Sequence, residues 1–78
     1  MSEFEALKRA VQILGGQTAL AKVCGGKVRQ QHVYNWINRD KKLPAQYAIK
    51  VQSATNEKGT VITASQLCPD VFISEHAA

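Results

Sequence analysis

The sequence predicts an all-α fold, a single compact domain of about five helices. Three observations predict it. Apolar residues recur at steps of three and four, glycine pairs and a proline separate the segments, and 78 residues with 45% hydrophobic side chains suffice for one core. A core of this size is thin, and chains this short often depend on a disulfide, a metal or a partner subunit.

The first helix is predicted for residues 2–14. Ser2 and Glu5 have the spacing of a capping box, in which each side chain satisfies a free backbone N–H of the first turn. The Gly15-Gly16 pair ends the helix, because glycine accepts the left-handed conformation that a helix end requires. The apolar residues that share one face are Phe4, Leu7, Val11 and Leu14.

Two more helices are predicted on either side of the second glycine pair, at about residues 17–23 and 29–38. The first of them spans barely two turns and needs its neighbours, since an isolated helix of that length is not stable. Its inward residues are expected to be Leu20, Val23 and Cys24. The apolar stripe of the second consists of Val33, Trp36 and Ile37, with Trp36 interpreted as a core anchor.

The other positions of the helix at 29–38 carry amides and an aromatic hydroxyl. A helix face that is merely solvated usually carries glutamate and lysine, which are strong helix formers. Amide side chains both donate and accept hydrogen bonds, so this face suits recognition of another polar surface. Its members are Gln30, Gln31, His32, Tyr34, Asn35 and Asn38.

A polar basic loop at 39–43 leads to a fourth helix, predicted for residues 44–55 with Pro44 at its first position. Thr63 or Ser65 is expected to cap one last helical turn that ends at Cys68. The residues expected to face inward from the fourth helix are Ala48, Ile49, Val51 and Ala54, with Tyr47 as a further candidate.

The end of the chain carries a brief apolar patch of Val71, Phe72 and Ile73. This patch is either a dimer surface or a segment that folds back onto the first helix. Residues 74–78 are expected to form a flexible tail, so the predicted domain spans residues 1–73.

Charge is concentrated in the middle of the chain. Residues 22–50 hold seven lysines and arginines against Asp40, a net charge of +6, whereas the flanks hold three basic residues against five acids, which leaves +4 overall. A basic centre between mildly acidic ends indicates one positive face and a polyanionic partner. The alternative is a solvated, lysine-rich surface.

Other classes of protein are not expected from this composition. Cys24 and Cys68 are interpreted as small core residues, because the N-terminus lacks a signal-peptide pattern and the compartment is then a reducing one. No metal or cofactor is expected, since His32 and His76 share no short ligand spacing with either cysteine. No apolar run approaches the ~20 residues of a membrane span. Six acids and no nucleophile–base pair argue against an enzyme.

Two short helices joined by a glycine turn, the second rich in amides, form the pattern of a helix-turn-helix. Ala21 supplies a small residue where the helices cross, and Gly25 tolerates a positive φ in the turn. Three runs carry a resemblance over about residues 8–72: GGQTALAKVCGGKVRQQHVYNWI, LPAQYAIKVQSAT and TASQLCPDVF. They resemble the Cro/YdaS-type family of small phage and prophage repressors, relative to which Gly26-Lys27 looks like a two-residue insertion.

The resemblance implies a lambda-repressor-like, five-helix domain that binds operator DNA in the bacterial cytoplasm, associated with the nucleoid. Glutamine and asparagine can pair with adenine, and arginine with guanine, in the major groove. The residues expected to read bases are Arg29, Gln30, Gln31, Tyr34 and Asn35. Tyr34 could bond a phosphate or touch a thymine methyl group, or else pack on the loop at 41–42. His32 either faces the groove or lies beneath the turn.

Phosphate contacts are expected around this helix. The free N–H groups at the start of the helix at 17–23 form a phosphate site, because the helix dipole favours an anion there. The expected contacts, of which about half should touch DNA, are Gln17, Thr18, Lys22, Lys27, Asn38, Arg39, Lys41 and Lys42.

The leading hypothesis is therefore a sequence-specific transcriptional regulator of the Cro-like repressor type. It is expected to bind double-stranded operator DNA as a homodimer, because one recognition helix reads only a few base pairs. The alternative is an antitoxin that binds a toxin protein and regulates its own operon, a role ascribed to some YdaS-like proteins.

Overall fold

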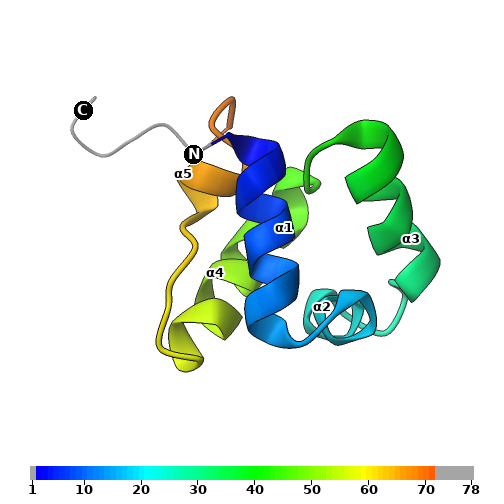
Figure 1. Cartoon of the computed structure of the whole chain (residues 1–78), viewed down its shortest axis with the longest axis horizontal. Helices are drawn as coiled ribbons and strands as arrows, with labels where there is room; N and C mark the ends of the chain where they lie inside the picture. The colour runs from blue at the N-terminus through cyan, green and yellow to red at the C-terminus, as the bar shows by residue number, and fades with distance from the viewer. Residues whose placement is uncertain (1, 72–78) are drawn as a thin grey trace.

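The computed structural model describes residues 2–71, which contain five α-helices, one π-helical segment and one 3₁₀ segment (Figure 1). No strand occurs within these residues. The elements are α1 (Glu3–Leu14), α2 (Gln17–Cys24), α3 (Gln30–Asn35), the π segment η1 (Trp36–Asp40), the 3₁₀ segment η2 (Ala45–Tyr47), α4 (Ala48–Glu57) and α5 (Ala64–Leu67). The predicted all-α single domain is confirmed.

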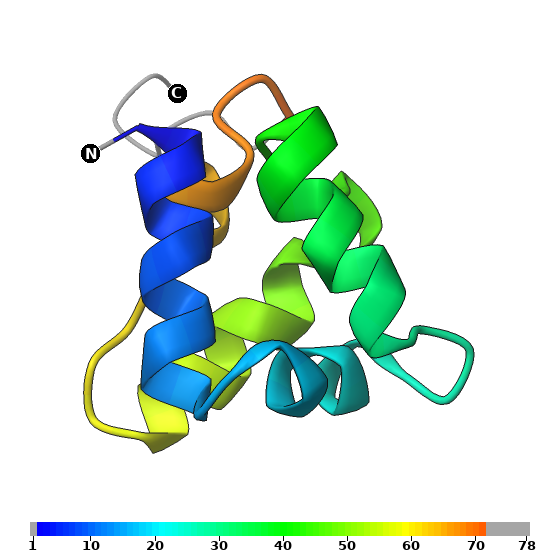
Figure 2. The ribbon, with the colours of Figure 1, turned by 45° about the vertical axis from the view of Figure 1, so that its right-hand side comes forward.

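The helices form two groups around α1. The first consists of α4 and α5, which pack against α1 and against each other. The second consists of α2, which packs on both α1 and α4, and α3, which packs chiefly on α2. As a result α3 lies at the edge of the molecule, on the side opposite α5 (Figures 1 and 2).

The N-terminal helix has the predicted ends. Ser2 Oγ accepts a hydrogen bond from the Glu5 N–H at 3.1 Å, and Glu5 Oε1 accepts from the Ser2 N–H at 3.3 Å, which completes the capping box. The Ser2 N–H and the Ser2 hydroxyl both donate to the Glu5 carboxylate and lower its pKa, because they stabilise its charged form. Gly15 ends the helix at φ 104°, in the left-handed region.

The core is one continuous cluster drawn from every helix. Val33 is fully buried and Trp36 is 8% exposed, so both anchor the edge helix as predicted. The Trp36 ring lies 5.5 Å from the ring of Tyr47, between centroids. The buried apolar residues are Ala6, Leu7, Ala10, Leu14, Leu20, Ala21, Cys24, Val33, Trp36, Leu43, Ala48, Val51, Ile62, Ala64, Leu67 and Cys68.

The helix predicted for 29–38 begins one residue later and continues further. Arg29 has extended backbone angles and is the N-cap of α3, and the helical path continues through η1 to Asp40. Asn38 Nδ2 donates to the Tyr34 carbonyl oxygen at 2.9 Å, which satisfies a carbonyl group where the turn widens to π geometry. Lys41 then ends the helix at φ 62°.

The fourth helix is divided differently from the prediction. Pro44 has ψ 138° and precedes the 3₁₀ segment η2, so it is not the first residue of a regular α-helix. Ile49, which was expected in the core, is 53% exposed. The inward stripe of α4 is Ala48, Val51 and Thr55, and a residue directly after Ala48 is rotated about 100° away from that stripe.

Thr55 connects α4 to the segment before α5. Its side chain is fully buried, donates to the Val51 carbonyl oxygen at 3.0 Å and accepts from the Ile62 N–H at 3.0 Å. One residue further on, Thr63 Oγ1 accepts from the Gln66 N–H at 3.2 Å, so Thr63 rather than Ser65 caps α5.

The far end of the predicted domain is described only in part. Val71 is 60% exposed, whereas Phe72, Ile73 and the tail predicted for 74–78 lie outside the described residues. No helix within residues 2–71 is long and apolar enough to cross a membrane.

Replacing Thr55 by valine should destabilise the fold, because the buried Ile62 N–H loses its acceptor. The expected loss is about 1–3 kcal/mol of the free energy of unfolding, measured by urea denaturation. Thr55→Ser keeps the hydroxyl and should lose less. A Thr55→Val protein as stable as the wild type would contradict this role.

Both cysteines are buried free thiols, and burial raises the pKa of Cys24 from 9.0 to about 11 and raises that of Cys68. The folded state therefore favours the protonated thiols. Their contribution to stability should be complete below about pH 9 and should be lost as the pH rises toward 11. Iodoacetamide at pH 8.5 should modify the folded protein much more slowly than the urea-unfolded one. Equal rates would contradict the burial.

Candidate nucleic-acid interface

The first residues of α2 and α3 lie side by side. Gln30 Nε2, at the first position of α3, donates a hydrogen bond to Gln17 Oε1, at the first position of α2. Gln17 was predicted as a phosphate contact and Gln30 as a base-reading residue, and the structure joins the two. Two polar side chains from different helices thus form one unit at the exposed end of the helix pair.

The turn between the two helices has the conformation predicted for it. Gly25 adopts φ 131° and donates its N–H to the Ala21 carbonyl oxygen at 3.2 Å. The Val28 N–H donates to the Gly25 carbonyl oxygen at 3.2 Å, which closes the turn. Ala21 is 3% exposed, as expected of a small residue at a helix crossing. The turn projects from the body of the molecule (Figure 2) and leaves Lys27 exposed.

The N-terminus of α3 is held by a histidine. His32 Nδ1 accepts a hydrogen bond from the Arg29 N–H at 2.9 Å, and the His32 N–H donates to the Arg29 carbonyl oxygen at 2.9 Å. His32 is exposed and does not lie beneath the turn. Arg29 is also exposed, so its guanidinium is available to a partner.

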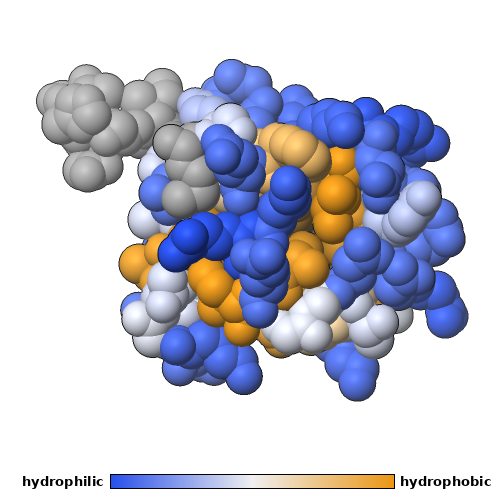
Figure 3. Space-filling model, viewed as in Figure 1, coloured by the Kyte–Doolittle hydropathy of each residue, from blue (hydrophilic) through white to orange (hydrophobic). Residues whose placement is uncertain are grey.

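The outer face of α3 carries a row of amides. Gln31 Nε2 donates to Asn35 Oδ1 at 3.3 Å, across one turn of the helix. Tyr34 is 47% exposed beside them. The space-filling view shows a hydrophilic edge where α3 lies, while hydrophobic side chains gather nearer the middle of the same face (Figure 3).

The residues that follow α3 make contacts within the molecule. Arg39 Nε lies 3.5 Å from Asp40 Oδ1, an exposed ion pair. Lys41 Nζ lies 4.8 Å from the centroid of the Phe4 ring, which places this cation against α1. The Asn38 amide nitrogen is bonded to the Tyr34 carbonyl oxygen. Arg39, Lys41 and Asn38, three of the predicted phosphate contacts, thus each have a partner within the molecule.

The other predicted phosphate contacts are exposed around the helix pair. Thr18 is the second residue of α2, whose N-cap Gly16 has no side chain to satisfy the free N–H groups of the first turn. Lys22 lies in the last turn of the same helix. Lys42 lies in the loop before α4 and lines a small apolar pocket with Leu43 and Pro44.

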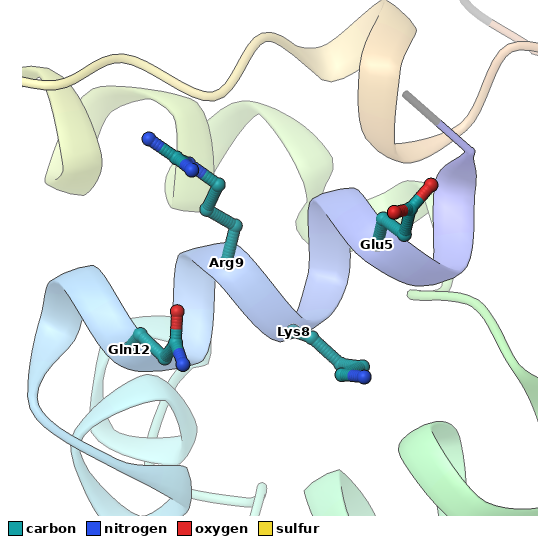
Figure 4. Close-up of a pocket in the computed structure, with 4 residues that line it drawn as sticks. All are labelled: Glu5, Lys8, Arg9 and Gln12. Carbon is teal, nitrogen blue, oxygen red and sulfur yellow. The ribbon is translucent and has the colours of Figure 1, made fainter.

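A hollow lies on the exposed face of α1 (Figure 4). Its lining residues are Glu5, Lys8, Arg9 and Gln12. Glu5 and Lys8 point in different directions, since the Glu5 carboxylate is bonded to Ser2 and the Lys8 ammonium lies 5.0 Å from the Phe4 ring centroid. Two of the three charged side chains at the hollow, those of Glu5 and Lys8, thus already have partners within α1 or at its N-cap.

Two hydrogen bonds that hold the helix pair were not predicted. Lys50 Nζ, from α4, donates to the Cys24 carbonyl oxygen at 3.4 Å and so binds the last residue of α2. His32 bonds Arg29, a partner that was not expected for it. The position of His32, three residues after the N-cap, is the signal that could have indicated its role.

Comparison with known proteins identifies a family for this chain. No curated protein and no solved structure matches the sequence significantly. Residues 7–76 match the family described as bacterial toxin YdaS, and this match covers most of the chain. The all-α helix-turn-helix architecture agrees with that match. The chain belongs to the YdaS family.

Proposed function

We propose that the protein is a sequence-specific DNA-binding regulator of transcription that places α3 in the major groove of duplex DNA. The observation that carries this proposal is the hydrogen bond between Gln30 and Gln17. A helix that reads bases needs side chains whose direction is fixed before binding, since flexible side chains lose more entropy when they bind. This bond fixes one such side chain at the start of α3.

The remaining hydrogen-bonding groups of this pair match the chemistry of DNA. Gln30 donates one N–H to Gln17 and keeps one N–H donor and its carbonyl oxygen. Adenine presents one acceptor, N7, and one donor, the N6 amino group, in the major groove. Gln17 keeps its own amide nitrogen at the start of α2, where a phosphate is favoured. One glutamine would then read a base while the other holds the backbone.

A second amide pair, within α3 itself, leaves similar groups free. Gln31 donates one N–H to Asn35 and keeps a donor and an acceptor for a second base pair. Arg29 is suited to guanine O6 and N7, or to a phosphate. Tyr34 would contact a phosphate or a thymine methyl group from its exposed position.

The charges around α3 support an anionic partner. Within residues 2–71 the one ion pair joins Arg39 to Asp40, so the lysines of this region have no carboxylate partner there. Those nearest to the helix pair are Lys22 and Lys27, with Lys42 in the following loop. We propose a Cro-like repressor that binds operator DNA as a homodimer, because two half-sites supply the specificity that one short helix lacks.

A second candidate function rests on the description of the family. The family that matches residues 7–76 is described as a bacterial toxin, and this description supports a role in a toxin–antitoxin pair. The chain would then be a component of such a pair, as the toxin or as an antitoxin that also binds its operator. Equal binding of unrelated DNA duplexes by the wild-type chain would favour this candidate.

Removal of either member of the glutamine pair should weaken binding of a duplex selected from a randomised DNA pool by the wild-type chain. Gln17→Ala and Gln30→Ala together should lose less than the sum of the single losses, with a coupling of about 0.5–3 kcal/mol, because the two side chains act as one unit. Ser53→Ala, on the exposed side of α4, serves as the control. Strictly additive losses would show that the pair is not a unit on DNA.

Gln31→Ala should reduce the preference for the selected duplex over a scrambled one by about tenfold, since one bidentate contact is worth about 1–3 kcal/mol. Lys27→Ala should instead weaken both duplexes alike and reduce the slope of log affinity against log salt by about 0.9. Titrations at two salt concentrations measure both effects. A Gln31→Ala chain with an unchanged preference would remove this residue from base reading.

A further inference from the structure

We propose that His32 is a positioning residue for base recognition, one that fixes Arg29 at the start of α3 through its imidazole nitrogen. This inference rests on the proposed function, since it concerns how the DNA-reading surface is built. In this role the His32 side chain acts on Arg29, a predicted base-reading residue, and not on DNA.

Two hydrogen bonds join the two residues. The Arg29 N–H donates to His32 Nδ1 and the Arg29 carbonyl oxygen accepts from the His32 N–H, both at 2.9 Å. The same carbonyl oxygen also accepts from the Val33 N–H at 3.4 Å, so the Arg29 N–H is the group that depends on the His32 side chain. The imidazole thus supplies one half of a capping box, with histidine in the place that glutamate or glutamine usually takes.

The chemistry of Arg29 explains why its neighbour must supply this bond. An N-cap residue usually satisfies the first turn with a side-chain oxygen, as Ser2 and Thr63 do in this protein. A guanidinium has five donors and no acceptor, so Arg29 cannot do so. A side-chain acceptor at the third position of the helix can instead bond the N–H of Arg29, and His32 occupies that position.

Other side chains can replace the acceptor that the imidazole supplies. His32 Nδ1 accepts the Arg29 N–H at 2.9 Å. Asn and Gln side chains also offer an acceptor, whereas alanine offers none. Substitution at this position can therefore separate the loss of the acceptor from the loss of the ring.

Loss of the acceptor should loosen the junction between the turn and the helix. Arg29 follows a turn that contains Gly25 and Gly26, and glycine restricts the backbone less than any other residue. Arg29 is held in an extended conformation at φ −117° and ψ 166°, directly before Gln30. Without the His32 bond, the backbone of Arg29 would take a wider range of conformations and its guanidinium would be placed less accurately. The preference for one base sequence would then fall more than the affinity for DNA in general.

The test compares wild type, His32→Ala and His32→Gln, with Ser53→Ala as the matched control. Each chain is titrated with a duplex selected from a randomised pool and with a scrambled duplex of the same composition. His32→Ala should reduce the ratio of the two affinities about tenfold, with affinity for the scrambled duplex within about twofold of wild type. His32→Gln should restore the ratio to within about threefold, because the glutamine side chain offers an acceptor to the Arg29 N–H. Thermal unfolding confirms that each variant is folded, and amide hydrogen exchange at Arg29 should be faster in His32→Ala alone.

Three results would overturn the inference. One is a folded His32→Ala chain that keeps the wild-type ratio. Another is a His32→Gln chain as impaired as His32→Ala, which would indicate that the ring itself contacts DNA. The third is a wild-type chain that binds the selected and the scrambled duplex alike. That result is a failure of the proposed function, and the titration of the wild type alone reveals it.

Discussion

A short helix that presents polar side chains on most of its surface must be held by very few buried residues, and the rest of this structure depends on that constraint. Only Val33 and Trp36 of the helical run through α3 and η1 are buried. An isolated helix of this length would not form, so its stability comes from packing on α2 and on the core. Because amides cover the outer face of α3, only a narrow strip of this helix is buried. For the same reason α3 lies at the edge of the molecule.

Polar contacts compensate for the small buried area. Lys50 binds the end of α2, His32 binds the start of α3, and Asn38 satisfies a carbonyl group near its end. Each of these bonds closes a place where a helix would otherwise leave backbone groups without partners. The polar side chains of the helix pair thus divide into those that hold the helices and those left free for a partner.

The sequence predicts the parts of this arrangement that depend on local chemistry. The capping box of α1, the positive φ of Gly25 and the anchor Trp36 follow from residue type and spacing, and the structure confirms each. The burial of Thr55 and the exposure of Ile49 could not be predicted in this way, because they depend on which face of α4 meets the core. The contact between Lys50 and Cys24 joins residues far apart in the chain, and no local pattern indicates it. The amide row was predicted as a set, but the bond from Gln30 to Gln17 depends on the packing of α2 against α3, which no local pattern indicates.

The central claim is that the start of α2 and the outer face of α3 together form the surface that reads DNA. Titration of the isotopically labelled chain with the selected duplex, followed by NMR, tests it most directly. The side-chain amide signals of Gln17, Gln30, Gln31 and Asn35 are predicted to shift most, and those of Gln12 on α1 to stay unchanged. Shifts confined to α1, α4 or α5, with the amides of α3 unaffected, would contradict the claim.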